Sequence, residues 1–212
     1  MELARGLRVK NRFCLGPMAG VTDAAFRTVC MEQGAGFCYT EMVSAKALTY
    51  RDQKTASLLA VTPAQRPVIA QIFGSEPDVM AEGARLALAL SGADGIDINM
   101  GCPMPKITGN GEGSALMRDC VRASRVIEAV RRAVPVPLSV KFRAGWDEDS
   151  RNAPAFARMA EESGADFLCV HGRTRAQFYG GSSDRSVIAA VKAAVSVPVI
   201  ASGDALSAGA CM

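Results

Sequence analysis

Cys102 is the residue whose type and position most directly indicate chemistry. It lies in the run Asp97-Ile98-Asn99-Met100-Gly101-Cys102-Pro103-Met104-Pro105-Lys106, where a short β-type stretch ends and a glycine-containing turn begins. Parallel α/β barrels present their catalytic groups at this position. A cysteine buried as a small hydrophobe is the common alternative, but Gly101 and Pro103 open the backbone around the sulfur. We therefore predict that the Cys102 thiol is a proton donor.

Further polar residues follow other β-type stretches in the same way. They are Gln71, Asn99, Lys141, Arg143, His171 and the turn Ser202-Gly203-Asp204. Taken singly, Gln71 can be a solvated loop residue, Lys141 an ion-pair partner of Asp97, and His171 a satisfied histidine at a strand end. Recurrence on four or more strands with apolar interiors favours one shared site at the carboxyl ends of those strands.

The elements that must position these residues alternate between short apolar runs and longer segments of helical period. This pattern is typical of βα units around a parallel sheet. The predicted strands are Phe13–Pro17, Phe37–Glu41, Val68–Phe73, Gly95–Asn99, Leu138–Phe142, Phe167–His171 and Val199–Ala201. The predicted helices include Glu76–Ser91, Cys120–Ala133, Ala153–Ser163 and Ser186–Val195.

Seven strands are one short of a closed (β/α)8 barrel, which usually needs about 250 residues. We therefore predict an α/β fold: an incomplete TIM barrel of about seven βα units, forming one domain over residues 1–212, with the eighth strand and a following helical domain missing. A natural seven-stranded or doubly wound sheet is the alternative, but no G-x-G-x-x-G motif is present.

Two sequence signals that repeat along the chain support the count of seven strands. Gly-Ala-Gly or Gly-Ala-Asp precedes a strand at residues 34–36, 92–94 and 164–166, and Pro-Val or Pro-Leu opens a strand at residues 67–68, 137–138 and 198–199. Each class recurs after about 60 to 70 residues, as expected for a barrel built from a two-unit repeat. The same signals also occur in other α/β proteins.

Composition excludes several classes of protein. With 49% hydrophobic and 21% charged residues, the 212-residue chain is typical of a globular domain, and it contains neither a membrane-length apolar run nor a signal peptide. We expect a cytoplasmic protein with no membrane partner, and a monomer, although the sequence does not determine the oligomeric state. Seven cysteines without a Cys-x-x-Cys pair, beside the single His171, predict neither disulfides nor a metal site. The net charge of +3 does not by itself identify a nucleic-acid binder.

Six motifs, in this order along nearly the whole chain, resemble those of the tRNA-dihydrouridine synthases, most closely the bacterial B-type. They are Pro17-Met18-Ala19-Gly20-Val21-Thr22-Asp23, Gln71-Ile72-Phe73-Gly74, the run from Asn99 to Lys106, Gly113-Ser114-Ala115-Leu116-Met117, Val140-Lys141-Phe142-Arg143 and His171-Gly172-Arg173-Thr174. The resemblance implies a TIM barrel that holds FMN and uses NADPH to reduce the 5,6 double bond of specific uridines in tRNA. NADH is not excluded as the reductant.

The resemblance also implies roles for individual residues. The implied cofactor-binding residues are Pro17, Met18 and Ala19 against the flavin, Gln71 at its ring, Lys141 at its electron-rich edge, His171 near its phosphate or the substrate pocket, and Ser202, Gly203 and Asp204 at its phosphate. The implied substrate-binding residues are Asn99, Lys106, Arg143, Arg173 and Arg175. The three arginines lie in predicted loops near the opening and suit RNA phosphates, unless they pair with Asp147, Glu148 or Asp184.

The implied reaction gives Cys102 a role. Hydride transfer from flavin N5 to C6 of uracil leaves enolate character, which a proton at C5 must quench from the opposite face. A thiol with a reference pKa of about 8.5 is mostly protonated at neutral pH, yet acidic enough to donate. A nucleophilic thiolate is the competing role, but the reaction needs no covalent intermediate. The RNA base must be unpaired or flipped to reach a buried flavin.

The chain departs from the family pattern at several points. Ser202 replaces a usual asparagine, Met104-Pro105 is atypical, and Arg185 stands where an aromatic residue is common. The family's next strand and its helical tRNA-binding domain are not in this sequence. We therefore expect the 212-residue chain alone to bind flavin weakly and tRNA poorly. Two alternatives stay open: another FMN barrel of the dihydroorotate dehydrogenase type, and an inactive fragment without cofactor.

Overall fold

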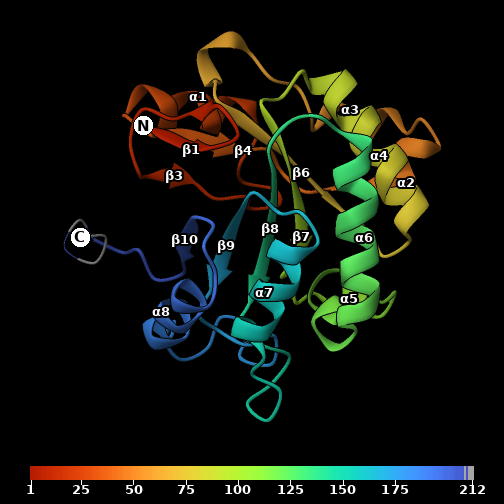
Figure 1. Cartoon of the computed structure of the whole chain (residues 1–212). Coiled ribbons are helices and arrows are strands. Elements are labelled where there is room, and N and C mark those ends of the chain that lie inside the picture. Colours follow the sequence, from red (N-terminus) through yellow and green to blue (C-terminus); the bar gives the residue numbers. More distant parts are fainter. Residues whose placement is uncertain (208, 210–212) are drawn as a thin grey trace.

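The computed structural model describes residues 1–207 and 209, and these build a curved, parallel sheet with helices on its outside (Figure 1). The strands run in the spatial order β10-β9-β8-β7-β6-β4-β3, and β5 pairs with β6 beyond the end of β4. Their bounds are β3 (Cys14–Leu15), β4 (Phe37–Tyr39), β5 (Val43–Ser44), β6 (Val68–Phe73), β7 (Gly95–Met100), β8 (Leu138–Arg143), β9 (Phe167–His171) and β10 (Val199–Ser202). In the described residues the sheet is therefore an incomplete barrel, as predicted.

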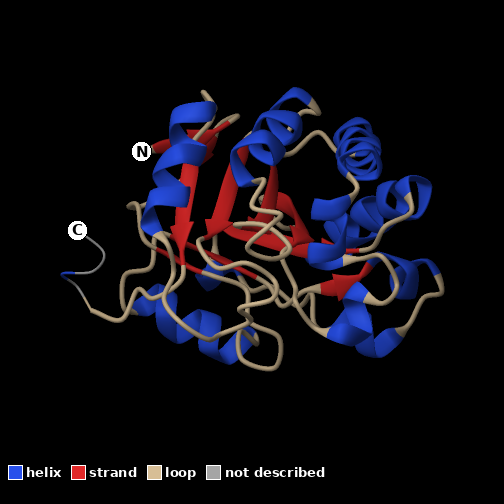
Figure 2. Ribbon diagram, turned by 90° about the horizontal axis from the view of Figure 1, so that it is seen from below, coloured by secondary structure: helices blue, strands red, loops and turns tan. Residues whose placement is uncertain are grey.

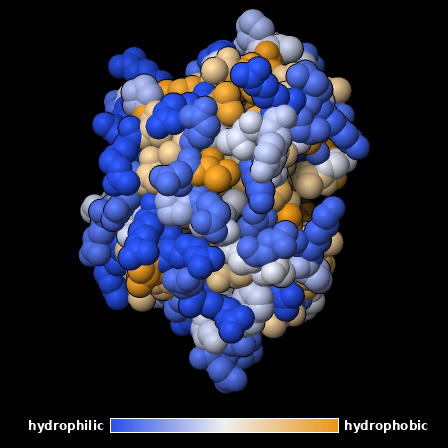
Figure 3. Space-filling model, turned by 90° about the vertical axis from the view of Figure 1, so that its right-hand side faces the viewer, coloured by the Kyte–Doolittle hydropathy of each residue, from blue (hydrophilic) through white to orange (hydrophobic). Residues whose placement is uncertain are grey.

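The helices follow the strands in the βα order that the sequence indicates. They are α1 (Ala24–Glu32), α2 (Ala45–Thr49), α3 (Gln53–Ser57), α4 (Pro77–Ser91), α5 (Pro105–Thr108), α6 (Cys120–Ala133), α7 (Ala153–Glu162) and α8 (Arg185–Ala194), with 3-10 helices η1 (Pro63–Gln65) and η2 (Gly113–Arg118). Figure 2, seen from below, shows helices around the strands and loops crossing in front. Figure 3 shows a mostly hydrophilic outer face with small apolar patches.

Local sequence explains where the main helices begin and end. The side chains of Asp23, Asp119 and Asp184 accept backbone hydrogen bonds at the first turns of α1, α6 and α8. Gly92 ends α4 in the left-handed conformation, with φ of 58°, where a side chain would be strained. The predicted helix boundaries are therefore correct to within one residue at each end.

The buried hydrophobic residues form three clusters, and strand side chains alternate between the two faces of the sheet. Ile98, Val140 and Phe142 face outward and pack with helix residues such as Val126 and Phe156. The Phe142 and Phe156 rings lie 5.1 Å apart. The other face of β7 and β8 therefore carries the polar residues at positions 97, 99, 139 and 141.

A hairpin of β1 (Glu2–Ala4) and β2 (Leu7–Arg8), absent from the predictions, lies at the amino ends of the barrel strands. Its Leu7 belongs to one buried cluster with Phe37, Tyr39 and Phe167. The predicted strand Phe37–Glu41 is also shorter than expected. The Thr40 hydroxyl accepts a hydrogen bond from the Gln71 backbone N–H at 3.0 Å. The Thr40 side chain thus takes the place of the backbone carbonyl that would accept this bond if the strand continued.

The repeated Gly-Ala-Asp and Pro-Val or Pro-Leu signals correspond to a repeated contact at the amino ends of the strands. The Asp94 carboxylate accepts from the Val68 backbone N–H at 2.8 Å and pairs with Arg66 at 2.6 Å. Two units later, Asp166 accepts from the Leu138 N–H at 2.8 Å and pairs with Arg131 at 2.7 Å. In each case the Asp of Gly-Ala-Asp accepts a hydrogen bond from the residue that follows the Pro, and it also pairs with an arginine. We call each of these contacts an Asp–Arg clamp.

Candidate functional site

The structure brings most of the predicted residues to the carboxyl ends of neighbouring strands. In the strand registers Gln71 lies beside Asp97, Asn99 beside Lys141, and Arg143 beside His171. Cys102 follows β7 directly and is 9% exposed. These residues therefore share one end of the barrel, where the sequence placed them.

A directed chain of hydrogen bonds connects the Cys102 backbone to the buried carboxyl group of Asp97. The N–H groups of Gly101 and Cys102 donate to Asn99 Oδ1 at 3.0 and 2.8 Å. Backbone N–H groups can only donate, so the Asn99 oxygen must face them and its Nδ2 must point to Gln71 Oε1, at 3.0 Å. Gln71 Nε2 then donates to Asp97 Oδ2 at 2.7 Å. Asn99 thereby fixes the loop that carries the thiol.

Gln71 and Asn99 consequently differ from their predicted surroundings. Gln71 has no exposed surface, and both ends of its amide are bonded within the chain. Asn99 is 8% exposed. Ser139, which the sequence analysis did not single out, donates to Asp97 Oδ1. The sequence signal that could have predicted this network was the presence of Ser139 and Asp97 within strands that are otherwise apolar.

The Cys102 thiol is held in its protonated form. Burial raises its pKa, while a hydrogen bond from the Met104 backbone N–H and the charges of Arg143 and Lys141 lower it. The Cys102 carbonyl accepts from Ser114 N and Oγ at 3.1 and 2.9 Å, so the backbone on this side of the sulfur is also fixed. The arrangement suits a proton donor better than a thiolate nucleophile.

Lys141 is a half-buried ammonium that forms no hydrogen bond or ion pair with any residue the structure describes. The alternative that it pairs with Asp97 is wrong, because the Asp97 carboxyl group is bonded to Gln71 and Ser139. Burial raises the pKa of Asp97 to about 7, against the hydrogen bonds from Ser139 and Gln71 and the charge of Lys141. The free cation is the group at this site best suited to an anionic ligand.

His171 is expected to stay neutral throughout the physiological pH range. Burial, and then the charges of Lys141, Arg143 and Arg173, lower its pKa to about 3. The folded pKa lies below the unfolded value of about 6.5, so the stability that neutral His171 contributes is complete above pH 6.5 and is lost as the pH falls toward 3. His171 is the only histidine, and its NMR ring signals should not shift between about pH 8 and pH 5. A titration midpoint near 6.5 in the folded protein would contradict this assignment.

The turn Ser202-Gly203-Asp204 closes against His171. Gly203 has φ of 99°, and a Cβ there would lie 2.6 Å from His171 Cδ2, so only glycine fits. The Asp204 carboxylate accepts from Arg173 Nη1 at 2.7 Å and from the Ser183 N–H at 2.7 Å. The Asp204 side chain is therefore engaged within the protein, and the turn can offer a ligand its backbone.

Pro17, Met18 and Ala19 follow β3 on an accessible loop, and Met18 is 45% exposed. The loop is held by Thr22 Oγ1, which accepts from the Met18 N–H at 3.1 Å, and by Glu41, which accepts from the Gly20 N–H at 2.5 Å. Lys106 lies exposed on the short helix α5.

The three predicted substrate-binding arginines have different surroundings. Arg143 is not in a loop: it ends β8, is 3% exposed, and donates to the carbonyls of Gly101, Thr174 and Phe178 at 2.8, 2.9 and 2.9 Å. Arg173, 7% exposed, pairs with Asp204 at 2.7 Å and not with Asp147, Glu148 or Asp184. Arg175 is half-buried, and its Nε has no hydrogen-bond partner.

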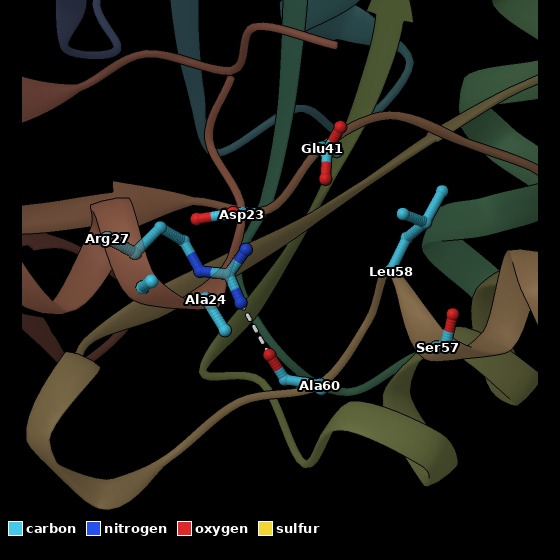
Figure 4. Close-up of a pocket in the computed structure, with 8 residues that line it drawn as sticks. Asp23, Ala24, Arg27, Glu41, Ser57, Leu58 and Ala60 are labelled. Carbon is cyan, nitrogen blue, oxygen red and sulfur yellow. Dashed lines mark hydrogen bonds between the residues drawn. The ribbon is translucent and has the colours of Figure 1, made fainter. Parts of the chain in front are cut away.

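A pocket of about 260 Å³ lies between α1 and the end of α3, and its lining includes Glu41, which follows β4 and accepts from the Gly20 N–H. Figure 4 shows Arg27 in its wall, reaching the carbonyl of Ala60. Arg27 also donates to the Thr22 carbonyl at 2.7 Å and to Gln65 Oε1 at 3.3 Å. Its donors join three chain segments, so this arginine is part of the scaffold.

Residues 1–207 and 209 contain neither a cluster of metal ligands nor a membrane-spanning helix. No group of three or more His, Cys, Asp and Glu side chains in these residues could hold a metal ion. Every helix in the same ranges is too short or too polar to cross a membrane.

Comparison with known proteins places this arrangement in a family. The model of the family described as dihydrouridine synthase matches residues 14–211. A protein of Rhizobium leguminosarum bv. phaseoli named "Probable tRNA-dihydrouridine synthase" is 48% identical over 93% of this chain, and tRNA-dihydrouridine synthase B of Pseudomonas aeruginosa is 45% identical over 92%. The chain spans 62% and 58% of the lengths of these two relatives.

Similarity among solved structures supports the fold alone. A variant of NCR from Zymomonas mobilis superposes with a TM-score of 0.61 at 15% identity, covering 92% of this chain and 75% of its own. It is a TIM-barrel-type protein, in agreement with the curved parallel sheet. The match of the family model over nearly all of the sequence shows that this chain belongs to the dihydrouridine synthase family.

Proposed function

We propose that this chain forms the catalytic face of an FMN-dependent enzyme that reduces uridines in tRNA to 5,6-dihydrouridine, with NADPH as the source of electrons. The observation that carries the proposal is the position of the buried Cys102 thiol and of Lys141, which has no hydrogen-bond or ion-pair partner among the described residues, at neighbouring strand ends of a family member. A tRNA substrate and NADPH also favour a cytoplasmic enzyme.

The residues at the strand ends fit FMN. Among the residues that the structure describes, Lys141 is a cation without a hydrogen-bond or ion-pair partner. The accessible Pro17-Met18-Ala19 loop offers an apolar surface, and Gly203 brings backbone close to His171. Lys141 and the loop would hold the flavin ring, and the backbone at Gly203 would hold the phosphate. When bound, FMN would supply the electron pair and hydrogen that add to C6 of the uracil ring.

The chain's own residues complete the reaction. The Cys102 thiol donates its proton to C5 of the base, and the resulting thiolate is reprotonated from solvent. Asn99 holds the Cys102 loop through the two backbone hydrogen bonds. The charge of Lys141 favours negative charge accumulating in the site, and His171, which stays neutral, adds no charge of its own there.

The proposal is tested by expressing the complete gene that encodes this sequence in a bacterial strain that lacks its own dihydrouridine synthases. Mass spectrometry of the tRNA should show the two-hydrogen mass increase at uridine. Lys141→Met should abolish the increase and reduce FMN retention, whereas Lys54→Met, on exposed α3, should leave both unchanged. Unmodified tRNA in the presence of folded, FMN-loaded protein would overturn the proposal.

A further inference from the structure

Trp146 is the only tryptophan of the chain, and two guanidinium groups lie over its ring. The Cζ atoms of Arg118 and Arg175 are 4.9 and 4.5 Å from the ring centroid. Arg118 ends η2, Trp146 lies in the loop after β8, and Arg175 lies in the loop after β9. The cluster therefore draws on the segments that follow three consecutive strands, at the same end of the barrel as Cys102.

The loops that carry this cluster are bonded to one another. The Arg175 N–H donates to the Gly145 carbonyl and the Ala176 N–H to the Trp146 carbonyl, both at 2.9 Å. Asn152 Nδ2 donates to the Met117 carbonyl, next to Arg118, at 2.8 Å. A Cβ at Gly145 would lie 2.2 Å from the Ser150 carbonyl oxygen, so the loop is tightly folded. The backbone that carries the three side chains of the cluster is therefore held in place.

Neither arginine is neutralised by the residues that the structure describes. Neither forms an ion pair within 4.0 Å, and Arg175 Nε is buried without any hydrogen-bond partner. The nearby acidic groups are engaged elsewhere, Glu148 and Asp184 by Arg151 and Asp119 by Arg122. Asp147 Oδ1 is buried and unbonded, and Asp149 is exposed.

We propose that Arg118 and Arg175, held by the Trp146 ring, bind the phosphodiester backbone of the RNA whose uridine reaches Cys102. This inference rests on the proposed function. Guanidinium groups match phosphate oxygens in geometry and charge. Stacking on the indole lowers the entropy that each long side chain loses on binding.

The test measures the binding of tRNA to the product of the complete gene. Labelled, unmodified tRNA, transcribed in vitro, should bind with a Kd, followed by fluorescence anisotropy, that weakens as salt is raised. Arg118→Ala and Arg175→Ala should each weaken binding about tenfold at low salt, reduce the salt slope by about one phosphate contact, and raise KM with little change in kcat. Arg85→Ala is the matched control, because Arg85 lies on α4 and pairs with Glu82.

Two variants of Trp146 separate support for the guanidinium groups from the folding of the loop. Anisotropy of labelled tRNA should show near-normal binding by Trp146→Phe, which keeps a ring, and weaker binding by Trp146→Ala. Circular dichroism checks that both are folded. If tRNA is reduced normally and the arginine variants bind as tightly as Arg85→Ala, this inference fails while the proposed function stands. If the arginines are needed for binding but uridine is never reduced, the proposed function fails while the RNA contact stands.

Discussion

Cys102→Ala should lower the rate of uridine reduction by about 10²–10⁴-fold, the usual contribution of a positioned general acid. FMN content and the Kd for tRNA should not change. Cys102 is 9% exposed, burial raises the pKa of its thiol, and its backbone is fixed by Asn99 and Ser114. Removing the thiol takes away the proton without disturbing the loop.

Single-turnover measurements of flavin reoxidation by tRNA would check this result, with Cys120→Ala, an exposed cysteine at the start of α6, as the control. The rate of the wild-type protein should also fall on the alkaline side, since only the protonated thiol can donate. Equal single-turnover rates in the Cys102→Ala and Cys120→Ala proteins would exclude the acid role.

Arg143→Met should lower the free energy of unfolding by about 3 kcal/mol or more. The substitution leaves the carbonyls of Gly101, Thr174 and Phe178 without their buried donor, and an unsatisfied buried group costs about 1–3 kcal/mol. Arg143→Lys should recover only part of this loss, because one ammonium cannot replace the guanidinium fork.

Urea unfolding would measure the change, and Arg85→Met, with one exposed ion pair, should stay within about 0.5 kcal/mol of the parent. The experiment also separates two roles of Arg143. Substitution of a residue that only bound RNA phosphate would raise KM and leave the urea midpoint unchanged, and that outcome would support the substrate-binding role predicted from sequence.

The sequence predicted the order of the elements well because its signals are local. Apolar runs identified all seven strands of the main sheet order, and Gly92 marked a helix end that its φ of 58° explains. The position of Cys102 after β7 followed from the same signals. The family resemblance then indicated which strand ends matter.

Partners in space could not be predicted in this way. Nothing local distinguishes Arg143, which binds three carbonyls, from Arg175, which has unsatisfied donors, because the difference depends on the loop at residues 174–181 folding back over β8. Likewise, two different strands supply Asp97, Gln71 and Asn99. The backbone N–H groups of residues 101 and 102 determine which atom donates and which accepts along this chain of hydrogen bonds. Trp146 meets Arg118 and Arg175 only after three segments assemble.

The two Asp–Arg clamps, at Asp94 with Arg66 and at Asp166 with Arg131, have a consequence for how this molecule can change over evolutionary time. They are duplicated parts at the amino ends of the strands, whereas the groups at the opposite ends occur once each. The contacts that anchor the strands are thus physically separate from the site, so loops at the carboxyl ends can change in sequence while the duplicated anchors preserve the architecture.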